Sequence, residues 1–167
     1  MHGPMRADRN GLPVPLAEAA LLWQRSDFPL IHALATRWAD NDIYGHVNNV
    51  VYYSWFDTAV NTVLMGRGLL DPHGGAIIGL VVESGCRYHR PLAFPQAVAL
   101  GLRIGRLGRS SICWEIGVFD DEAPEAAAEG RFVHVHVDRE TRRPVPVPEA
   151  WRRALADLIV PVAGGAA

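Results

Sequence analysis

Apolar residues dominate the stretch between Asn48 and Gly66, and their spacing predicts one long helix. Asparagine is a favourable N-cap, so the helix is expected to begin at Asn48 or Asn49. It is expected to end at Met65, where Gly66 and Gly68 follow. Only a narrow polar stripe interrupts the apolar surface: Ser54, Asp57, Thr58 and Asn61. A helix that is apolar nearly all round has to be buried nearly all round, so the rest of the chain is expected to wrap it.

Several other segments show the alternation of apolar and polar residues that is typical of β-strands. Strands are predicted over residues 28–38, 76–88, 98–104, 112–118 and 133–137. The turns between the later strands are short, so these strands are expected to be antiparallel neighbours. A short terminal helix is expected to carry Trp151, Leu155 and Leu158. One long buried helix together with a run of antiparallel strands indicates an α+β fold, with the sheet curled around the helix.

The N-terminal part differs from this pattern. Residues 1–27 are rich in proline, glycine and charge, which predicts an extension that is disordered in part. Residues 28–160 are then expected to form a single domain, since a chain of 167 residues can bury one sizeable core.

Composition excludes some classes of partner. The apolar fraction of 49% and the charged fraction of 20% are ordinary for a globular protein. The formal net charge is −2, so no overall basic field attracts nucleic acid or an anionic membrane. An anionic ligand would therefore need a local group of arginines. No nucleic-acid or membrane partner is expected.

The cysteines and the N-terminus favour the cytoplasm. Cys86 and Cys113 are not spaced like a metal-binding pair, and they are expected to be free thiols. The first residues lack the apolar core of a secretory signal. The apolar run from Leu16 to Trp23 is too short to span a bilayer.

One segment carries a specific motif. Residues 37–52 read Arg-Trp-x-Asp-x-Asp-x-x-Gly-His-Val-Asn-Asn-x-x-Tyr, and this string resembles the hotdog-fold thioesterases of the 4-hydroxybenzoyl-CoA thioesterase-like family. Weaker similarities follow in the same order at residues 82–91, 107–111 and 129–138. The resemblance extends from about residue 30 to residue 155.

The resemblance implies a hotdog fold and the hydrolysis of an acyl-CoA or acyl-carrier-protein thioester. In the family motif the reacting carboxylate is the second aspartate of the Asp-x-Asp pair, which is Asp42 here. It also implies a homodimer or homotetramer in which pairs of subunits join their sheets and share active sites. No cofactor is expected, because CoA is part of the substrate.

The chemistry of a thioester explains why these residue types are suitable. A carboxylate such as Asp42 can act as a general base on water, or attack directly to give a mixed anhydride, and the sequence leaves both open. Backbone amides in the first turn of the helix could polarise the thioester carbonyl. His46 is a catalytic candidate, although it could equally hydrogen-bond the backbone at the helix start. Asn49 is a third candidate, with helix capping as the alternative. Asp40 is expected to be structural.

Other residues are candidates for binding the substrate. Arg109, Ser110 and Ser111, with Arg90, could hold the phosphates of CoA, or they could be solvated turn residues. Tyr52 and Tyr88 could line an acyl or aryl pocket, although core packing is the commoner fate of such aromatics.

Two histidines near the end of the domain have a spacing that can hold a metal ion. His134 and His136 project from the same face of a strand, but no third ligand is evident. No metal site is therefore predicted, and a surface or interface position is expected.

Two alternative functions stay open. His46 is compatible with a hotdog-fold hydratase or dehydratase acting on acyl thioesters. The other alternative is a non-catalytic acyl-CoA-binding protein.

Overall fold

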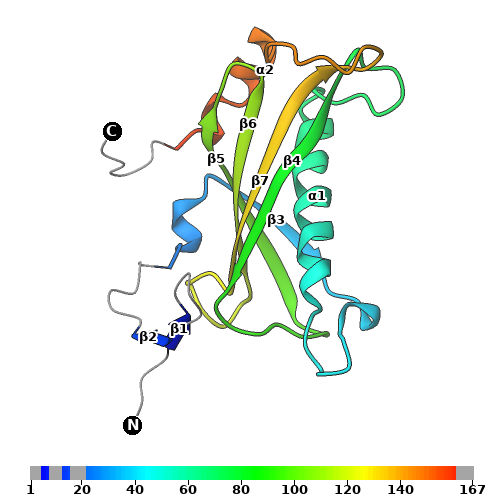
Figure 1. Cartoon of the computed structure of the whole chain (residues 1–167). Helices are drawn as coiled ribbons and strands as arrows, with labels where there is room; N and C mark the ends of the chain where they lie inside the picture. The colour runs from blue at the N-terminus through cyan, green and yellow to red at the C-terminus, as the bar shows by residue number, and fades with distance from the viewer. Residues whose placement is uncertain (1–4, 8–12, 16–21, 161–167) are drawn as a thin grey trace.

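The computed structural model describes residues 5–7, 13–15 and 22–160 (Figure 1). The elements in chain order are β1 (Met5–Ala7), β2 (Pro13–Pro15), β3 (Leu30–Ala35), α1 (Asn49–Gly66), β4 (Ile77–Tyr88), β5 (Ala97–Leu107), β6 (Ser111–Phe119), β7 (Ala128–Asp138) and α2 (Glu149–Ala154). Most of the predicted N-terminal extension lies outside the described residues. Within it, β1 and β2 pair with each other as a separate antiparallel two-stranded sheet.

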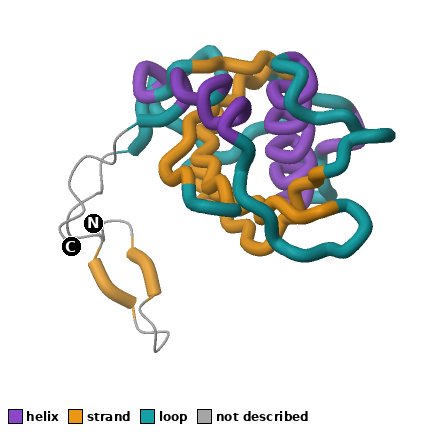
Figure 2. Tube along the Cα trace, turned by 90° about the horizontal axis from the view of Figure 1, so that it is seen from above, coloured by secondary structure: helices purple, strands orange, loops and turns teal. Residues whose placement is uncertain are grey.

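A five-stranded antiparallel sheet curves around α1, with the strand order β3-β5-β6-β7-β4 (Figures 1 and 2). The predicted α+β layout is therefore confirmed. The expectation that all the later strands are neighbours is wrong for β4, which pairs with β7 and not with β5. The segment from residue 89 to residue 96 carries the chain from one edge of the sheet across to β5. Spacing along the sequence does not reveal this crossover, because strand order is set by contacts that are distant in the chain.

The first strand is shorter than predicted. It covers Leu30–Ala35 instead of residues 28–38, because the residues at the two ends of the predicted range have other contacts and another backbone conformation. Phe28 packs against Phe119 and Trp23 in a small separate cluster. At the other end the backbone of residues 38–40 forms one 3₁₀ turn.

The predicted helix is confirmed at Asn49–Gly66, and its buried face supplies much of the core. The buried residues are Tyr52, Trp55, Phe56, Ala59, Val60, Val63 and Leu64. Burial is incomplete, however. In a single chain Val50 is 64% exposed and Met65 is 46% exposed, on the side of the helix that carries the polar stripe. The sheet therefore wraps the helix on one side only. No helix among the described residues is long and apolar enough to cross a membrane.

The helix lies very close to the sheet at one point. Gly130 of β7 faces the ring of Phe56, and a methyl group added at Gly130 would overlap that ring. Phe56 is fully buried, so the ring has little room to move.

Gly130→Ala is therefore expected to lower the free energy of unfolding by about 1–3 kcal/mol, the usual cost of overpacking a core. Gly85→Ala is the matched control, because a methyl group at that position of β4 meets no atom within 4 Å. Urea titration followed by circular dichroism measures both variants. Equal stability of the two variants would contradict the close helix–sheet contact.

Candidate active site

A buried carboxylate anchors the loop between β3 and α1. The Asp40 side chain is fully buried and accepts hydrogen bonds from the Arg37 amide at 2.7 Å and from the Arg37 guanidinium at 2.7 and 3.0 Å. The Asp40 carbonyl accepts from the amide of Asn48, the N-cap of α1, at 2.8 Å. One residue thus ties the end of β3 to the start of the helix, in the structural role expected of Asp40.

A tight turn at the tip of this loop presents Asp42. The Asp42 carbonyl accepts from the Gly45 amide at 3.0 Å, and the Asp42 amide donates to the His46 carbonyl at 2.9 Å. Gly45 has a φ of 81°, a conformation that residues with side chains rarely adopt. Glycine therefore allows the turn to close and returns the chain to the helix.

Among the described residues, the Asp42 carboxylate is held through one of its two oxygens. Oδ1 accepts from the Tyr44 amide at 2.8 Å, which is an Asx turn. Oδ2 accepts no hydrogen bond from any described residue. The two interpretations of Asp42, turn residue and reacting group, are thus compatible, since the turn fixes one oxygen and leaves the other available.

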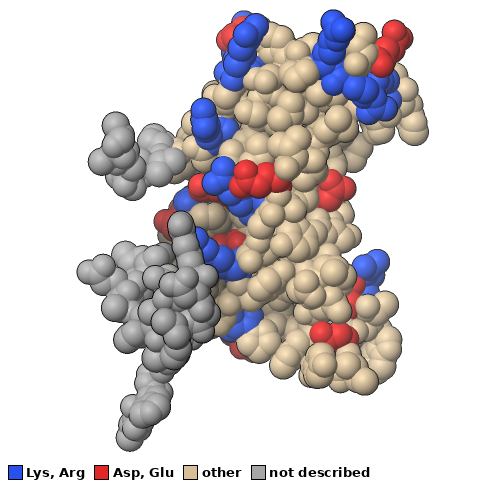
Figure 3. Space-filling model, in the orientation of Figure 1, with Lys and Arg blue, Asp and Glu red and all other residues tan. Residues whose placement is uncertain are grey.

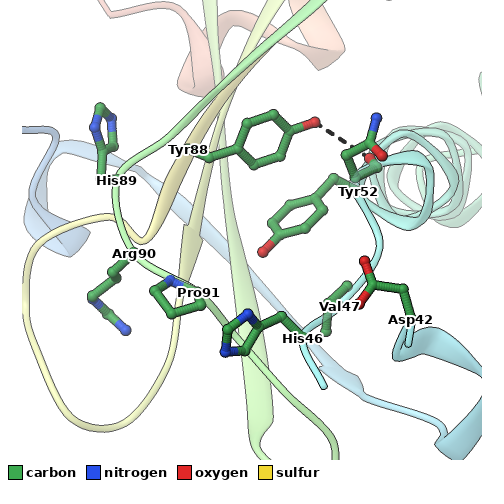
Figure 4. Close-up of a pocket in the computed structure, with 9 residues that line it drawn as sticks. Asp42, His46, Val47, Tyr52, Tyr88, His89, Arg90 and Pro91 are labelled. Carbon is green, nitrogen blue, oxygen red and sulfur yellow. Dashed lines mark hydrogen bonds between the residues drawn. The ribbon is translucent and has the colours of Figure 1, made fainter. Parts of the chain in front are cut away.

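The turn borders an open cavity of about 410 Å³ beside the start of α1 (Figure 4). Its walls are Asp42, His46, Val47, Asn49, Tyr52, Tyr88, His89, Arg90 and Pro91. Six of the nine predicted site residues lie in these walls, although they come from the loop, the helix and the end of β4. The fold therefore brings together most of a site that the sequence distributes over two motifs.

The start of α1 offers fewer free amides than expected. The Val50 amide donates to the Asn48 side chain at 3.1 Å, and the Val51 amide donates to the Asn48 carbonyl at 3.0 Å. Capping is thus performed by Asn48. The Asn49 amide makes no hydrogen bond within the described part of the chain, and Asn49 lies in the cavity wall.

Two tyrosines form the aromatic side of the cavity. The rings of Tyr52 and Tyr88 meet edge to face with centroids 5.0 Å apart. The Tyr88 hydroxyl donates to the Asn49 carbonyl at 3.3 Å, the contact marked in Figure 4. Burial raises the pKa of Tyr52 to about 12 and also raises the pKa of Tyr88. Both are therefore neutral phenols that contribute hydrogen bonds and apolar surface but no charge.

Arg90 is already paired within the chain. Its guanidinium forms a fork with the carboxylate of the nearly buried Asp120, with Nη2–Oδ1 at 2.8 Å. This pairing raises the pKa of Arg90 and lowers the pKa of Asp120. Arg90 thus lines the cavity, but its charge is balanced by the protein itself. A role in holding phosphate stays a prediction.

The other phosphate candidates lie far from this cavity within one chain. On β7, Tyr88 is paired with Ala128 and Ser111 with Val135. Seven residues of strand correspond to about 23 Å. Figure 3 shows several basic side chains at the upper end of the molecule, which is the end opposite the start of α1. Arg109, Ser110 and Ser111 therefore do not line the cavity of Asp42 within one chain, and their role in holding phosphate stays a prediction.

Comparison with known proteins now decides the family. Residues 36–155, most of the chain, match the family model of the thioesterase-like superfamily. The chain belongs to this superfamily. Its helix in a curved antiparallel sheet is a hotdog fold, as the motif predicts.

Solved structures agree with this assignment. The PA5185 protein of Pseudomonas aeruginosa strain PAO1 is 54% identical, with a TM-score of 0.78 over 81% of this chain and 95% of that chain. The PA2801 protein of Pseudomonas aeruginosa, described as a proposed thioesterase, is 33% identical, with a TM-score of 0.71 over 76% and 98%. A 1,4-dihydroxy-2-naphthoyl-CoA thioesterase from Synechocystis shares the fold at 19% identity, with a TM-score of 0.69 over 77% and 96%. Curated proteins gave no match.

Sequence reasoning missed three cavity residues of this thioesterase-like protein, Val47, His89 and Pro91. The Val47 amide donates to the Leu92 carbonyl at 2.7 Å, which holds the loop against the segment after β4. The His89 Nε2 lies 3.4 Å from the Glu129 carboxylate. Each of the three is next to a predicted site residue in the sequence, and this position in the two motifs was the signal that could have identified them.

The position expected for His134 and His136 is wrong. Both side chains are buried, with 4% and 1% exposure, and do not lie on a surface. They share the face of β7 that carries Gly130 and Phe132, and this face packs against α1. Alternation along the strand predicted that the two histidines share a face, but it could not tell which face is the inner one. No group of three or more potential ligands that could hold a metal ion occurs among the described residues.

Burial of these histidines makes the stability of this thioesterase-like protein depend on pH. Burial lowers the pKa of His136 from 6.5 to about 4 and also lowers the pKa of His134. The unfolded chain then binds more protons than the folded chain below pH 6.5, so the free energy of unfolding falls as the pH falls toward 4. The loss for one such group is at most about 1.4 kcal/mol per pH unit.

Urea titrations between pH 7.5 and pH 4.5 test this dependence. The wild type is expected to lose more stability over this range than His136→Gln, which lacks the group. His73→Gln, at an exposed histidine, is expected to follow the wild type. Parallel pH profiles for wild type and His136→Gln would contradict the buried neutral imidazole.

Proposed function

We propose that this protein hydrolyses acyl-CoA thioesters to a carboxylic acid and free CoA, with Asp42 as the reacting carboxylate. Membership of the thioesterase-like superfamily supports thioester hydrolysis. The observation that carries the specific proposal is the Asp42 carboxylate, which is anchored through Oδ1 at the edge of a cavity while Oδ2 stays available.

The free oxygen of Asp42 suits both possible first steps. As a general base, Oδ2 takes a proton from a water that attacks the thioester carbonyl. As a nucleophile, it attacks the carbonyl carbon itself, and water then hydrolyses the anhydride. Each route needs an ionised carboxylate.

The developing oxyanion requires donors beside the same carboxylate. Asn49 lines the cavity at the start of α1, and we propose that its backbone amide, together with the positive end of the helix dipole, supplies this stabilisation. One such donor is worth about 10²–10³ in rate in other hydrolases. His46 is exposed and also lines the cavity, which supports the proposal that it orients the attacking water.

The proposed assembly is a homodimer formed through β4. This strand is at an edge of the sheet, and its residues Leu80, Val81 and Val82 are 37–61% exposed. An exposed apolar edge strand is a template for pairing with another strand. A two-fold axis through the middle of β4 would extend the sheet and cover the exposed side of α1.

The proposed location is the cytoplasm, and the proposed reaction uses no cofactor beyond the CoA of the substrate. Cys86 and Cys113 are both free, which fits a reducing compartment.

Asp42→Asn is expected to lower kcat for acyl-CoA hydrolysis by about 10²–10⁴, because the amide can neither accept the proton nor attack. The assay follows the free thiol released from a panel of aliphatic and aromatic acyl-CoAs.

Asp138→Asn is the matched control. The Asp138 carboxylate also accepts backbone amides of its own turn, from Glu140 at 3.1 Å and Thr141 at 2.7 Å, but it lies outside the cavity. This variant is expected to keep wild-type activity. Undiminished thiol release by Asp42→Asn would refute the role of Asp42. Addition of water to an enoyl-CoA without thiol release would indicate a hydratase instead, and binding without turnover would indicate a non-catalytic protein.

A further inference from the structure

The segment between β4 and β5, residues 89–96, forms a support beside the candidate site. The amides of His89 and Arg90 donate to the Ala127 carbonyl at 2.8 and 3.2 Å. The Arg90 guanidinium is paired with the nearly buried carboxylate of Asp120. This crossover segment is therefore attached at its start to the β6–β7 loop, and His89 and Arg90 at that start also line the cavity.

The turn that presents Asp42, residues 41–46, is not fixed by apolar packing. Ile43 and Tyr44 at its tip are 93% and 83% exposed. The backbone and carboxylate hydrogen bonds of Asp42 stay within the turn. Asp40 holds the two ends of the loop, whereas the direction of the turn between them needs a separate contact.

Asn41 supplies that contact. Its side-chain Oδ1 accepts a hydrogen bond from the Phe94 amide at 2.9 Å. Within the described part of the chain, this is the one hydrogen bond that joins residues 41–46 to a distant segment. Val47, which is paired with Asn41 across the base of the turn, donates from its amide to the Leu92 carbonyl at 2.7 Å. The two legs of the turn thus bind alternate residues of the same crossover segment.

The two legs make different demands on the sequence. The Val47 bond joins backbone groups, and every residue except proline has such an amide. The Asn41 bond needs a side-chain oxygen at the position directly before Asp42. Its partner is also held in place, because the rings of Phe94 and Trp38 meet edge to face with centroids 6.1 Å apart. The direction of the turn therefore depends on the identity of one side chain.

We infer that Asn41 is a positioning residue, which holds the Asp42 carboxylate at the cavity through its hydrogen bond to the Phe94 amide. This inference rests on the proposed hydrolysis and deepens it by naming a residue that acts through Asp42. Asn41 does not line the cavity and takes no part in bond breaking. Its effect is on geometry, because a displacement of about 1 Å between reacting groups can lower a rate about 100-fold.

Two substitutions of nearly equal volume separate positioning from stability. Asn41→Leu cannot accept from the Phe94 amide. Thr36→Val is the matched control, because the Oγ1 of the buried Thr36 donates to the Gln96 carbonyl at 2.7 Å, on the same crossover segment. Each variant loses one hydrogen bond between a side chain and the backbone of that segment. Both are therefore expected to lower the urea midpoint of unfolding by similar amounts.

Steady-state hydrolysis of an acyl-CoA gives the kinetic test. Asn41→Leu is expected to lower kcat about 10–100-fold and to change KM less than about 2-fold, because the loss is in the alignment of the carboxylate and not in substrate binding. Thr36→Val is expected to keep the wild-type kcat. An unchanged kcat in Asn41→Leu, or an equal fall in both variants, would overturn the inference.

Backbone order parameters from NMR relaxation test the same contact without any turnover. Residues 42–46 are expected to have values of about 0.85 in the wild type and in Thr36→Val, and to fall below about 0.6 in Asn41→Leu. Asn41→Asp keeps an acceptor oxygen and is expected to retain the wild-type values. Wild-type values in Asn41→Leu, or the same loss in Asn41→Asp as in Asn41→Leu, would contradict the inference.

The outcomes separate this inference from the proposed function. If the wild type releases no thiol from any acyl-CoA, the hydrolysis is refuted, whereas the order parameters still decide whether Asn41 holds the turn. Hydrolysis that depends on Asp42 but not on Asn41 would refute only the positioning role.

Discussion

The position of the candidate site depends on the buried carboxylate of Asp40. Its side chain binds Arg37 at the end of β3, while its backbone carbonyl binds Asn48 at the start of α1. These bonds hold the start of the helix close to the end of the strand. Since the Asp42 turn lies between these two attachments, its distance from the helix start is fixed as well. Loss of the Asp40 side chain would remove the attachment to Arg37 and leave the loop held by backbone hydrogen bonds, such as that of the Val47 amide to the Leu92 carbonyl.

The turn chemistry and the proposed catalytic chemistry support each other at Asp42. An aspartate in such a turn usually satisfies a backbone amide, and Asp42 does so through Oδ1. A carboxylate has several acceptor positions, so this bond orients the group without exhausting it. The Asx turn, which is the common explanation for an aspartate at such a position, is therefore also the interaction that would hold a reacting carboxylate in place. For the same reason, Asx geometry in a hotdog loop is no argument against catalysis.

Periodicity in the sequence predicts the parts of this fold that depend on local contacts. The helix at Asn49–Gly66 and the alternating strands are found close to where they were expected. Strand order is different, because pairing of β4 with β7 involves residues about 50 apart in the chain and leaves no local signal. The inward direction of His134 and His136 was equally hidden. The inner face of β7 is the one on which Gly130 lies against Phe56, and alternation alone does not distinguish it from the other face. Among the site residues, those within the first motif were predictable, but the pairing of Arg90 with Asp120 requires the folded chain.

The helix α1 carries more apolar surface than a single chain buries. Sequence analysis expected a helix buried nearly all round, yet Val50 and Met65 stay exposed at its two ends. Val50 follows Asn49, which lines the cavity of Asp42, and Met65 lines a second cavity at the other end of the helix. Both cavities border the edge strand β4. The second copy proposed to pair along β4 would cover this helix face. The apolar composition of α1 therefore supports the proposed pairing of two chains.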